Sequence, residues 1–179
     1  VQQRRDQYTI QFPNNNGDTW FRCGQIGTVA AGHSADVVTF QLDSVEMING
    51  DWNHWAYTKN RLTGEMKLFF NGRQIGQFTN KTKPLNDGGR SRIRIGSLDE
   101  YWAELAAAGS NAQPYYGDIN DFQIWDKALD SAELSAIIYK DVSVSNPNYN
   151  NLVTYYPFEG TSQAVIADAG SHGNDGDAS

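Results

Sequence analysis

The stretches that decide the fold are Trp52-Asn-His-Trp-Ala-Tyr-Thr58 and Glu65-Met-Lys-Leu-Phe-Phe-Asn-Gly72. Each predicts a β-strand, and the Asn-Gly pair at the end of the second predicts a tight hairpin turn. Both central residues of a type I′ turn need positive φ, which Asn and Gly tolerate better than other residues. The region therefore predicts an antiparallel meander of three strands, over residues 52–58, 66–70 and 74–78.

Similar short apolar or alternating segments recur along the whole chain. They predict further strands over residues 8–12, 19–26, 37–42, 92–95, 119–125 and 152–158. One convincing helix begins at Asp130-Ser-Ala-Glu133, which has the pattern of a capping box. Leu134, Ile137 and Ile138 share one face of this helix, and Tyr139 is expected to end it. Short strands separated by turns, with one short helix, favour an antiparallel β-sandwich over an α/β fold.

A second informative stretch lies further on, where Tyr116-Gly-Asp-Ile-Asn-Asp-Phe-Gln-Ile-Trp-Asp-Lys-Ala-Leu129 leads into Ser131-Ala-Glu-Leu134. Together with the meander, these segments resemble the laminin-G-like branch of the concanavalin A-like lectin/glucanase superfamily. The resemblance covers roughly residues 50–176 and is weak before residue 50. It implies an all-β fold, a concanavalin A-like antiparallel β-sandwich (jelly roll) with one short helix, as a single domain over residues 1–179.

The end of the chain has an unusual order. Leu152-Val-Thr-Tyr-Tyr-Pro-Phe-Glu159 and Asp168-Ala-Gly-Ser-His-Gly-Asn-Asp-Gly176 resemble the segment that usually opens such a domain, but here it comes last. Residues 152–179 are either a permuted first strand or the start of a second repeat. We favour the permuted strand, because a lone strand would leave its aromatic side chains exposed.

Composition narrows the classes of function. Fourteen basic and 21 acidic residues give a formal charge of −7, which disfavours a nucleic-acid partner. Cys23 is the only cysteine, so an internal disulfide and a metal site of four thiolate ligands are both excluded. No apolar run approaches the roughly 18 residues needed to span a bilayer, so no membrane insertion is expected. Because the chain begins at Val1 rather than Met, we expect a processed piece of a larger exported protein.

Catalytic patterns are weak. Glucanase relatives carry Glu-x-Asp-x-Glu or Glu-x-Asp-x-x-Glu on one strand, and no such run occurs here. Asp118 and Asp121 are three residues apart, so on a strand they point to opposite faces and are interpreted as structural. Glu100 and Glu104 are expected to be solvated. The resemblance to the family's Trp-x-His strand implies that His54 is a packing and hydrogen-bonding residue. The tryptophans interpreted as core residues are Trp52, Trp55 and Trp125.

The segment from residue 98 to residue 115 lacks strand periodicity and mixes aromatic with polar side chains. Aromatic faces stack on sugar rings, while carboxylates and amides hydrogen-bond hydroxyl groups. The candidate ligand-binding residues are Asp99, Tyr101, Trp102, Asn111, Gln113 and Tyr115. The alternative is a short helix that caps the sandwich, with its tryptophan turned inward.

The family resemblance also implies a structural Ca²⁺ ion. Relatives hold it with an Asp-x-x-Gly-x-Gly-Asn-Asp-Gly loop, which Asp168, Asn174 and Asp175 match here. Oxygen ligands in a glycine-rich loop suit calcium. Asp and Asn beside Gly are also ordinary turn residues, so both interpretations stay open.

Taken together, these features predict a non-catalytic, lectin-like carbohydrate-binding or adhesion module of a larger secreted or surface-attached bacterial protein. The expected partners are a glycan or polysaccharide and other domains of the parent protein, and the expected location is periplasmic or attached to the outer membrane of a Gram-negative bacterium. Two alternatives remain: a glycoside hydrolase with a non-standard carboxylate pair, and a structural, protein-binding spacer domain. Fold resemblance alone does not decide among them.

Overall fold

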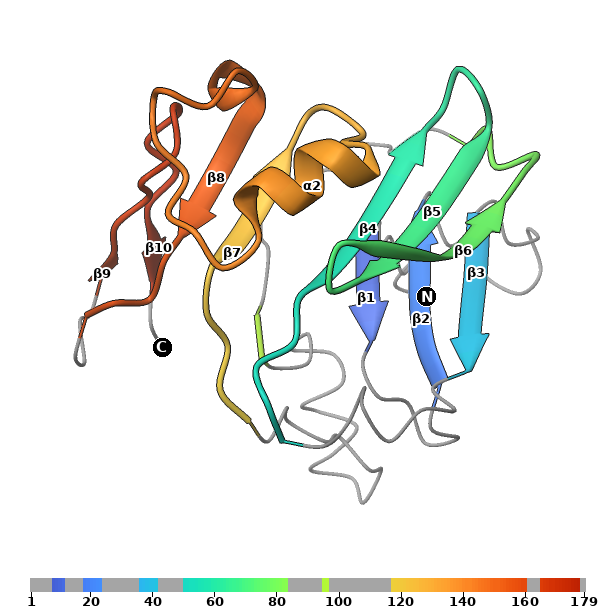
Figure 1. Ribbon diagram of the computed structural model, residues 1–179, viewed down its shortest axis with the longest axis horizontal. Coiled ribbons are helices and arrows are strands. Elements are labelled where there is room, and N and C mark those ends of the chain that lie inside the picture. The colour runs from blue at the N-terminus through green and yellow to red at the C-terminus, as the bar shows by residue number, and fades with distance from the viewer. Residues whose placement is uncertain are drawn as a thin grey trace, which may run out of the picture. The chain divides into compact units, whose positions relative to one another are not determined.

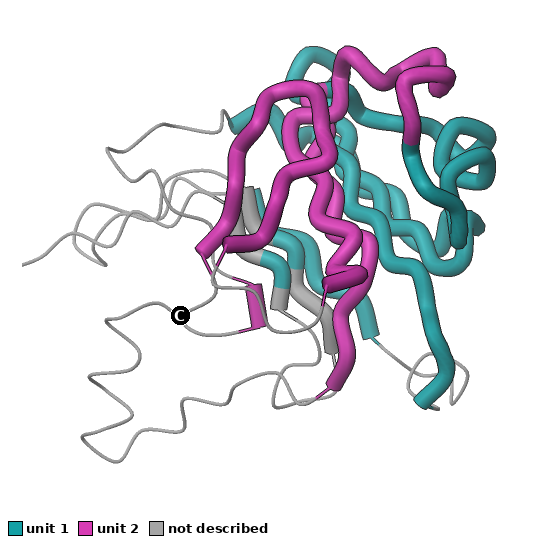
Figure 2. The backbone as a smooth tube through the Cα atoms, turned by 90° about the vertical axis from the view of Figure 1, so that its left-hand side faces the viewer, with its two compact units in different colours: residues 1–90, 127–142 teal, residues 91–126, 143–179 magenta. Residues whose placement is uncertain are grey.

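The computed structural model describes residues 8–11, 18–23, 36–41, 50–83, 95–96, 117–160 and 165–177. The chain divides into two compact units (Figure 2). Unit 1 comprises residues 1–90 and 127–142, and unit 2 comprises residues 91–126 and 143–179.

Unit 1 contains two antiparallel sheets of three strands each (Figure 1). The first sheet has the order β1 (Tyr8–Gln11), β2 (Asp18–Cys23) and β3 (Asp36–Gln41). The second has the order β4 (Trp55–Asn60), β5 (Glu65–Phe70) and β6 (Arg73–Phe78). These bounds agree with the predicted strands, except that β4 begins three residues later than expected.

The two sheets of unit 1 share one apolar core. Phe21 on β2 and Val38 on β3 pack with Met66 on β5, and all three are buried. Tyr57 and Phe78 pack against this cluster from the second sheet. The rings of Phe21 and Tyr57 have centroids 5.2 Å apart. Because the core draws side chains from both sheets, unit 1 is a β-sandwich.

The predicted hairpin turn joins β5 to β6. Asn71 has φ 48° and Gly72 has φ 78°, as a type I′ turn requires. The Asn71 N–H also donates to the His54 carbonyl at 2.9 Å. A Cβ atom on Gly72 would lie 3.0 Å from Ser135 Oγ, so this turn packs closely against a helix.

That helix is α2 (Ser131–Ile137), and its predicted start is confirmed. The Asp130 side chain accepts from the N–H groups of Ala132 and Glu133, while the Glu133 side chain accepts from the Asp130 N–H. Leu134 and Ile137 are buried, as their shared face predicts. Tyr139, just after the helix, has φ 54°.

Unit 2 is built on an antiparallel pair, β7 (Phe122–Trp125) and β8 (Leu152–Tyr156). A short 3₁₀ helix, η3 (Tyr149–Asn151), leads into β8, and a second small ladder joins β9 (Val165–Ile166) to β10 (Gly176–Asp177). Leu152 and Tyr155 are buried, and the Tyr155 hydroxyl donates to Asp121 Oδ1 at 2.8 Å. This hydrogen bond agrees with the structural role expected for Asp121.

The tryptophan assignments have mixed outcomes. Trp55 and Trp125 are half-buried, and the Trp55 ring packs on Phe70 with centroids 4.9 Å apart. Trp52 was expected in the core, and that prediction is wrong, because the side chain is 62% exposed. The alternation argument assumed a strand from residue 52, whereas the strand begins at Trp55.

Two predicted segments fall outside the described residues: the strand over residues 92–95, apart from residue 95, and the segment 98–115. Within the described part of the chain, no helix is both long and apolar enough to cross a membrane.

Candidate functional site

The six ligand-binding residues expected from the sequence cannot be placed in the site. Asp99, Tyr101, Trp102, Asn111, Gln113 and Tyr115 all lie outside the described residues. Their role stays a prediction, and the candidate sites below come from other parts of the chain.

The first candidate is the turn over residues 168–176, where calcium was expected. Asp168 Oδ1 accepts from the N–H groups of Tyr155 at 2.7 Å and Gly170 at 2.8 Å. Asp168 Oδ2 accepts from the Asn174 N–H at 2.7 Å, and Asp175 Oδ1 accepts from the Asp168 N–H at 2.9 Å. The Asp168 carboxylate therefore organises backbone N–H groups.

The same turn also donates hydrogen bonds to backbone carbonyls of β8. The Ala169 N–H donates to the Tyr155 carbonyl, and Asn174 Nδ2 donates to the Val153 carbonyl. Ser171 donates to the Leu152 carbonyl through both its N–H and its hydroxyl. Edge strands need such protection, because their free backbone groups otherwise pair with other chains.

Calcium needs six to eight oxygen ligands. Three N–H donors already point at Asp168, and in the described part of the chain no group of three His, Cys, Asp or Glu residues could hold a metal ion. In this arrangement both Asp168 oxygens and Asp175 Oδ1 accept backbone N–H groups. The calcium site stays a prediction for experiment.

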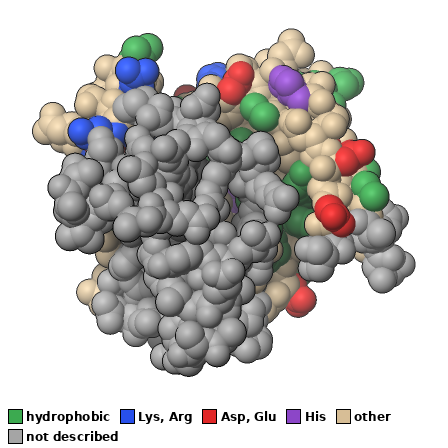
Figure 3. Space-filling model, turned by 180° about the vertical axis from the view of Figure 1, so that it is seen from behind, with side chains coloured by type: hydrophobic (Ala, Val, Ile, Leu, Met, Phe, Trp, Pro, Cys, Tyr) green, Lys and Arg blue, Asp and Glu red, His purple; other side chains and the backbone are tan. Residues whose placement is uncertain are grey.

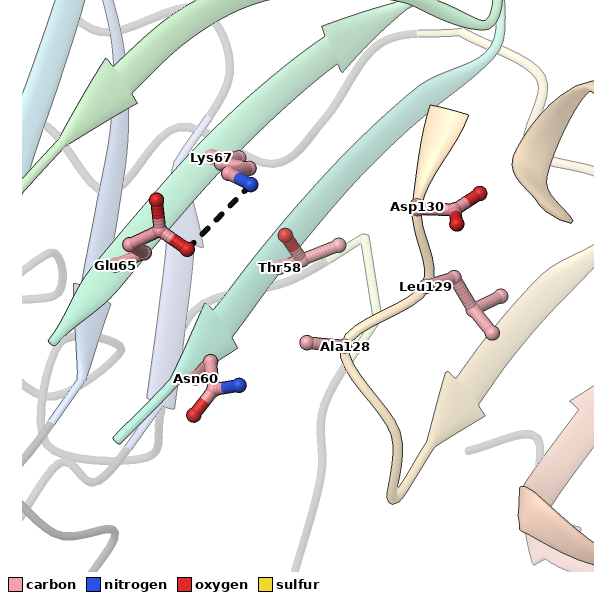
Figure 4. Close-up of a pocket in the computed structure, with 7 residues that line it drawn as sticks. All are labelled: Thr58, Asn60, Glu65, Lys67, Ala128, Leu129 and Asp130. Carbon is pink, nitrogen blue, oxygen red and sulfur yellow. Dashed lines mark ion pairs between the residues drawn. The ribbon is translucent and has the colours of Figure 1, made fainter. Parts of the chain in front are cut away.

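The second candidate is a small pocket in unit 1, with a volume of about 80 Å³ (Figure 4). It is lined by Thr58, Asn60, Glu65, Lys67, Ala128, Leu129 and Asp130. On one side of the pocket, along β5, Lys67 Nζ pairs with Glu65 Oε2 at 3.5 Å.

The polar groups of this pocket already have structural partners. Glu65 Oε1 accepts from Gln77 Nε2 at 2.8 Å, and Asn60 Oδ1 accepts from two N–H groups of the β4–β5 turn. Ligand pockets commonly measure roughly 300–1,000 Å³. The pocket is therefore too small to enclose a sugar ring.

The third candidate is an exposed aromatic surface of unit 1. Trp52 lies just before β4 and is 62% exposed, and Tyr139 lies just after α2 and is 63% exposed. We call these two residues, with Asn53 and Asn71, the aromatic platform.

A hydrogen-bond network joins the four members of the aromatic platform. The Tyr139 hydroxyl lies 3.2 Å from the Trp52 carbonyl oxygen and 3.0 Å from Asn71 Oδ1. Asn71 Nδ2 donates to Asn53 Oδ1 at 3.0 Å, and Asn53 Nδ2 donates to the Asp51 carbonyl at 3.2 Å. The His54 N–H also donates to Asn71 Oδ1, at 2.8 Å. Asn71 thus connects the hairpin turn to Tyr139, to Asn53 and to the His54 backbone, and Tyr139 in turn contacts the Trp52 carbonyl.

Local backbone geometry places each member. The type I′ turn projects Asn71 toward the start of β4, and the left-handed conformation of Tyr139 turns the chain sharply after α2. Positive φ is costly for a bulky residue and persists only where surrounding contacts enforce it. Here those contacts are the hydrogen bonds of the phenol, 68 and 87 residues away in sequence.

The aromatic platform can present flat apolar rings to a ligand, with amide and hydroxyl groups beside them. Sequence reasoning missed it because Trp52 was interpreted as core and Tyr139 only as the end of the helix. The one local signal was the mismatch between a large aromatic residue and the Asp51-Trp52-Asn53 polar setting.

Charge does not concentrate on the described surface seen in Figure 3, where acidic side chains appear singly. Among the described ion pairs, the buried one joins Lys59 to Asp36, whose side chains are each 8% exposed. Neither belongs to the aromatic platform.

Comparison with known proteins bears on the fold. The family model described as the concanavalin A-like lectin/glucanases superfamily matches residues 2–135. No curated protein matches the chain.

Two solved structures are similar. One is a "putative carbohydrate binding protein" from Bacteroides ovatus, with a TM-score of 0.53 and 16% identity, over 91% of this chain and 52% of that one. The other is part of an S-layer domain-containing protein from Clostridium thermocellum, with a TM-score of 0.41 and 23% identity, over 76% of this chain and 65% of that one. The chain thus spans about half the length of the first, and at such identities the likeness concerns the fold alone.

Proposed function

Because the chain belongs to the concanavalin A-like lectin/glucanases superfamily, we propose that it is a non-catalytic carbohydrate-binding module whose aromatic platform contacts sugar. The family match confirms the resemblance seen in the sequence, and it begins at residue 2, in the region where that resemblance was weak. It ends at residue 135, so the segments around residues 152–159 and 168–176 lie beyond it. The predicted fold class, an antiparallel β-sandwich of the concanavalin A type, is confirmed.

The observation that carries the proposal is the exposure of two aromatic residues, Trp52 at 62% and Tyr139 at 63%, which are joined where the Tyr139 hydroxyl contacts the Trp52 carbonyl oxygen. Leaving two large aromatic rings in water gives up the stabilisation that their burial would provide. Such rings are common where a partner covers them, and the C–H face of a pyranose is a flat apolar partner of that kind. The Asn53 amide, which is hydrogen-bonded to the Asn71 amide and to the Asp51 carbonyl, belongs to the same network.

Support from the described carboxylates for a hydrolase is weak. A glycosidase needs two carboxyl groups about 5–9 Å apart across a cleft. Asp121 is engaged by the Tyr155 hydroxyl, Asp168 by three N–H groups and Asp130 by the start of α2. Binding without catalysis is therefore the function that the described residues support best.

We place this module in a larger secreted or surface-attached bacterial protein, where it would hold neighbouring domains near a polysaccharide. Two facts support this setting. The Bacteroides ovatus protein carries the words carbohydrate binding in its name, and this chain covers only 52% of its length. A periplasmic or outer-membrane location is part of the same proposal.

The test is a glycan array probed with the purified chain and three variants. Trp52→Ala should reduce the signal on every bound glycan, because the main stacking ring is lost. Leu62→Ala is the matched control, since Leu62 is 95% exposed in the turn between β4 and β5 and makes no part of the platform. Trp102→Ala tests the segment predicted from the sequence. An array with no bound glycan would contradict the proposed function.

A further inference from the structure

We propose that the aromatic platform selects uncharged sugar chains over anionic ones, an inference that rests on the proposed carbohydrate-binding function. The ligand class is a neutral polysaccharide whose pyranose rings offer a flat C–H face.

The hydrogen bonds that join the platform's members link neutral groups. The phenol of Tyr139, the amides of Asn53 and Asn71 and the Trp52 carbonyl supply every donor and acceptor between them. Carboxylates and sulfates are recognised in proteins by Arg and Lys, through charge-assisted hydrogen bonds. A surface of rings and amides offers stacking and neutral hydrogen bonds, which suit hydroxyl groups.

The platform is organised before any ligand arrives. Tyr139 is held at φ 54°, and its hydroxyl is fixed on the Trp52 carbonyl oxygen and on Asn71 Oδ1. Asn71 is itself fixed by the His54 N–H and by the type I′ turn. A preformed surface loses less conformational entropy on binding, which favours a stiff, flat ligand. With its proton donated inward, the Tyr139 oxygen can still accept a hydrogen bond from a sugar hydroxyl group.

Charge beside the platform gives no preference for an anion. Asp51 precedes Trp52, Lys140 and Asp141 follow Tyr139, and Arg73 follows the Asn71-Gly72 turn; all four are exposed. Their formal charges cancel, so they give no local attraction for an anion, and the whole chain carries −7. That net charge acts against a polyanion, whereas a neutral polysaccharide is unaffected.

The experiment compares a neutral with an anionic polysaccharide, glucomannan and polygalacturonate, by isothermal titration with the full chain. We expect glucomannan to bind with an affinity that changes less than about 2-fold between about 0.05 M and 0.5 M NaCl, because screening acts on charges. Polygalacturonate should bind at least about 10-fold more weakly, a difference of about 1.4 kcal/mol.

Variants test whether the preference for neutral polysaccharide depends on the aromatic platform. Trp52→Ala should weaken glucomannan binding by about 10-fold or more, and Trp52→Phe, which keeps a smaller ring, should lose less. Lys140→Gln removes the cation next to Tyr139 and should leave glucomannan binding unchanged. Thermal melting of each variant separates lost binding from lost folding.

Three results would contradict the expectations, and each contradicts a different claim. Polygalacturonate binding that is tighter, falls with salt and is lost in Lys140→Gln would overturn the neutral preference while the proposed function stands. Glucomannan binding that survives both Trp52 variants would overturn the role of the platform. If the glycan array shows no bound sugar at all, the proposed function itself fails.

Discussion

Asp36 and Lys59 form an ion pair that joins the two sheets of unit 1. Lys59 Nζ lies 2.5 Å from Asp36 Oδ2 and donates to the Lys81 carbonyl at 2.9 Å. Asp36 also accepts from the Lys83 N–H at 2.7 Å. Asp36→Ala should lower the free energy of unfolding by about 3–5 kcal/mol, because it leaves a buried ammonium without its counter-charge. Urea unfolding measures this loss.

Two variants serve as controls for that pair. The double variant Asp36→Leu with Lys59→Met should be less destabilised than Asp36→Ala, since no buried charge is left alone. Lys67→Met breaks the exposed pair with Glu65 and should cost less than about 1 kcal/mol. A loss for Asp36→Ala no larger than for Lys67→Met would show that the buried pair contributes little.

Tyr156 couples the stability of unit 2 to alkaline pH. Burial first, and then the negative charges of Asp168 and Asp175, raise the pKa of its phenol above the usual 10.0. The hydroxyl donates to the Asn174 carbonyl at 2.5 Å. A raised folded-state pKa means that this contribution is complete below about pH 10 and is lost as pH rises through the folded pKa. Tyr156→Phe should therefore fall less steeply in thermal stability above about pH 10 than the parent chain. If the thermal stability of Tyr156→Phe fell as steeply with pH as that of the parent chain, this expectation would be wrong. Tyr149→Phe is the control variant.

At the scale of elements, α2 depends on its first turn. The Asp130 side chain accepts from two N–H groups, both at 2.9 Å, that the helix cannot satisfy itself. Asp130→Ala should cost about 1 kcal/mol, and Asp130→Asn, which keeps an acceptor, should cost much less. Chemical denaturation of the two variants measures which loses more free energy of unfolding. If both lose the same amount, the charge of Asp130 and not its role as an acceptor stabilises the helix.

The turn over residues 168–176 tests the calcium prediction. Because Asp168 already accepts three backbone N–H groups, we expect EDTA to leave the melting temperature unchanged. Asp168→Ala should cost about 1–3 kcal/mol, since the part-buried N–H groups of Tyr155 and Gly170 lose their acceptor. A melting temperature that rises with added calcium and falls with EDTA would instead establish the ion.

Local patterns in the sequence predicted the elements well. The Asn71-Gly72 turn and the Asp130–Glu133 capping box depend on residues close in sequence, and both formed as expected. The aromatic platform was missed because it depends on Tyr139 contacting a carbonyl 87 residues away. The role of Asp168 was equally hidden, since one of its donors is the Tyr155 N–H on another strand. Periodicity carries no information about such contacts.

At the scale of the whole molecule, the question is whether residues 143–179 complete this fold or begin another. β8 pairs with β7 in antiparallel register, with Phe122 opposite Tyr156 and Gln123 opposite Tyr155. Leu152 is fully buried, and Tyr155 is 2% exposed. A strand that closes the fold should be needed for stability, while the start of a second repeat should not.

A chain that stops after Val142 distinguishes these alternatives. We expect it to melt at a lower temperature or to aggregate, because β7 loses its partner and Asp121 loses the Tyr155 hydroxyl. Adding residues 143–179 as a separate polypeptide should restore part of the stability if the permuted-strand prediction is right. The variant Leu152→Asp in that polypeptide is the matched control, since it places a charge at a buried position and should abolish the rescue. A shortened chain that melts like the parent would favour the second-repeat alternative, with β8 as its first strand.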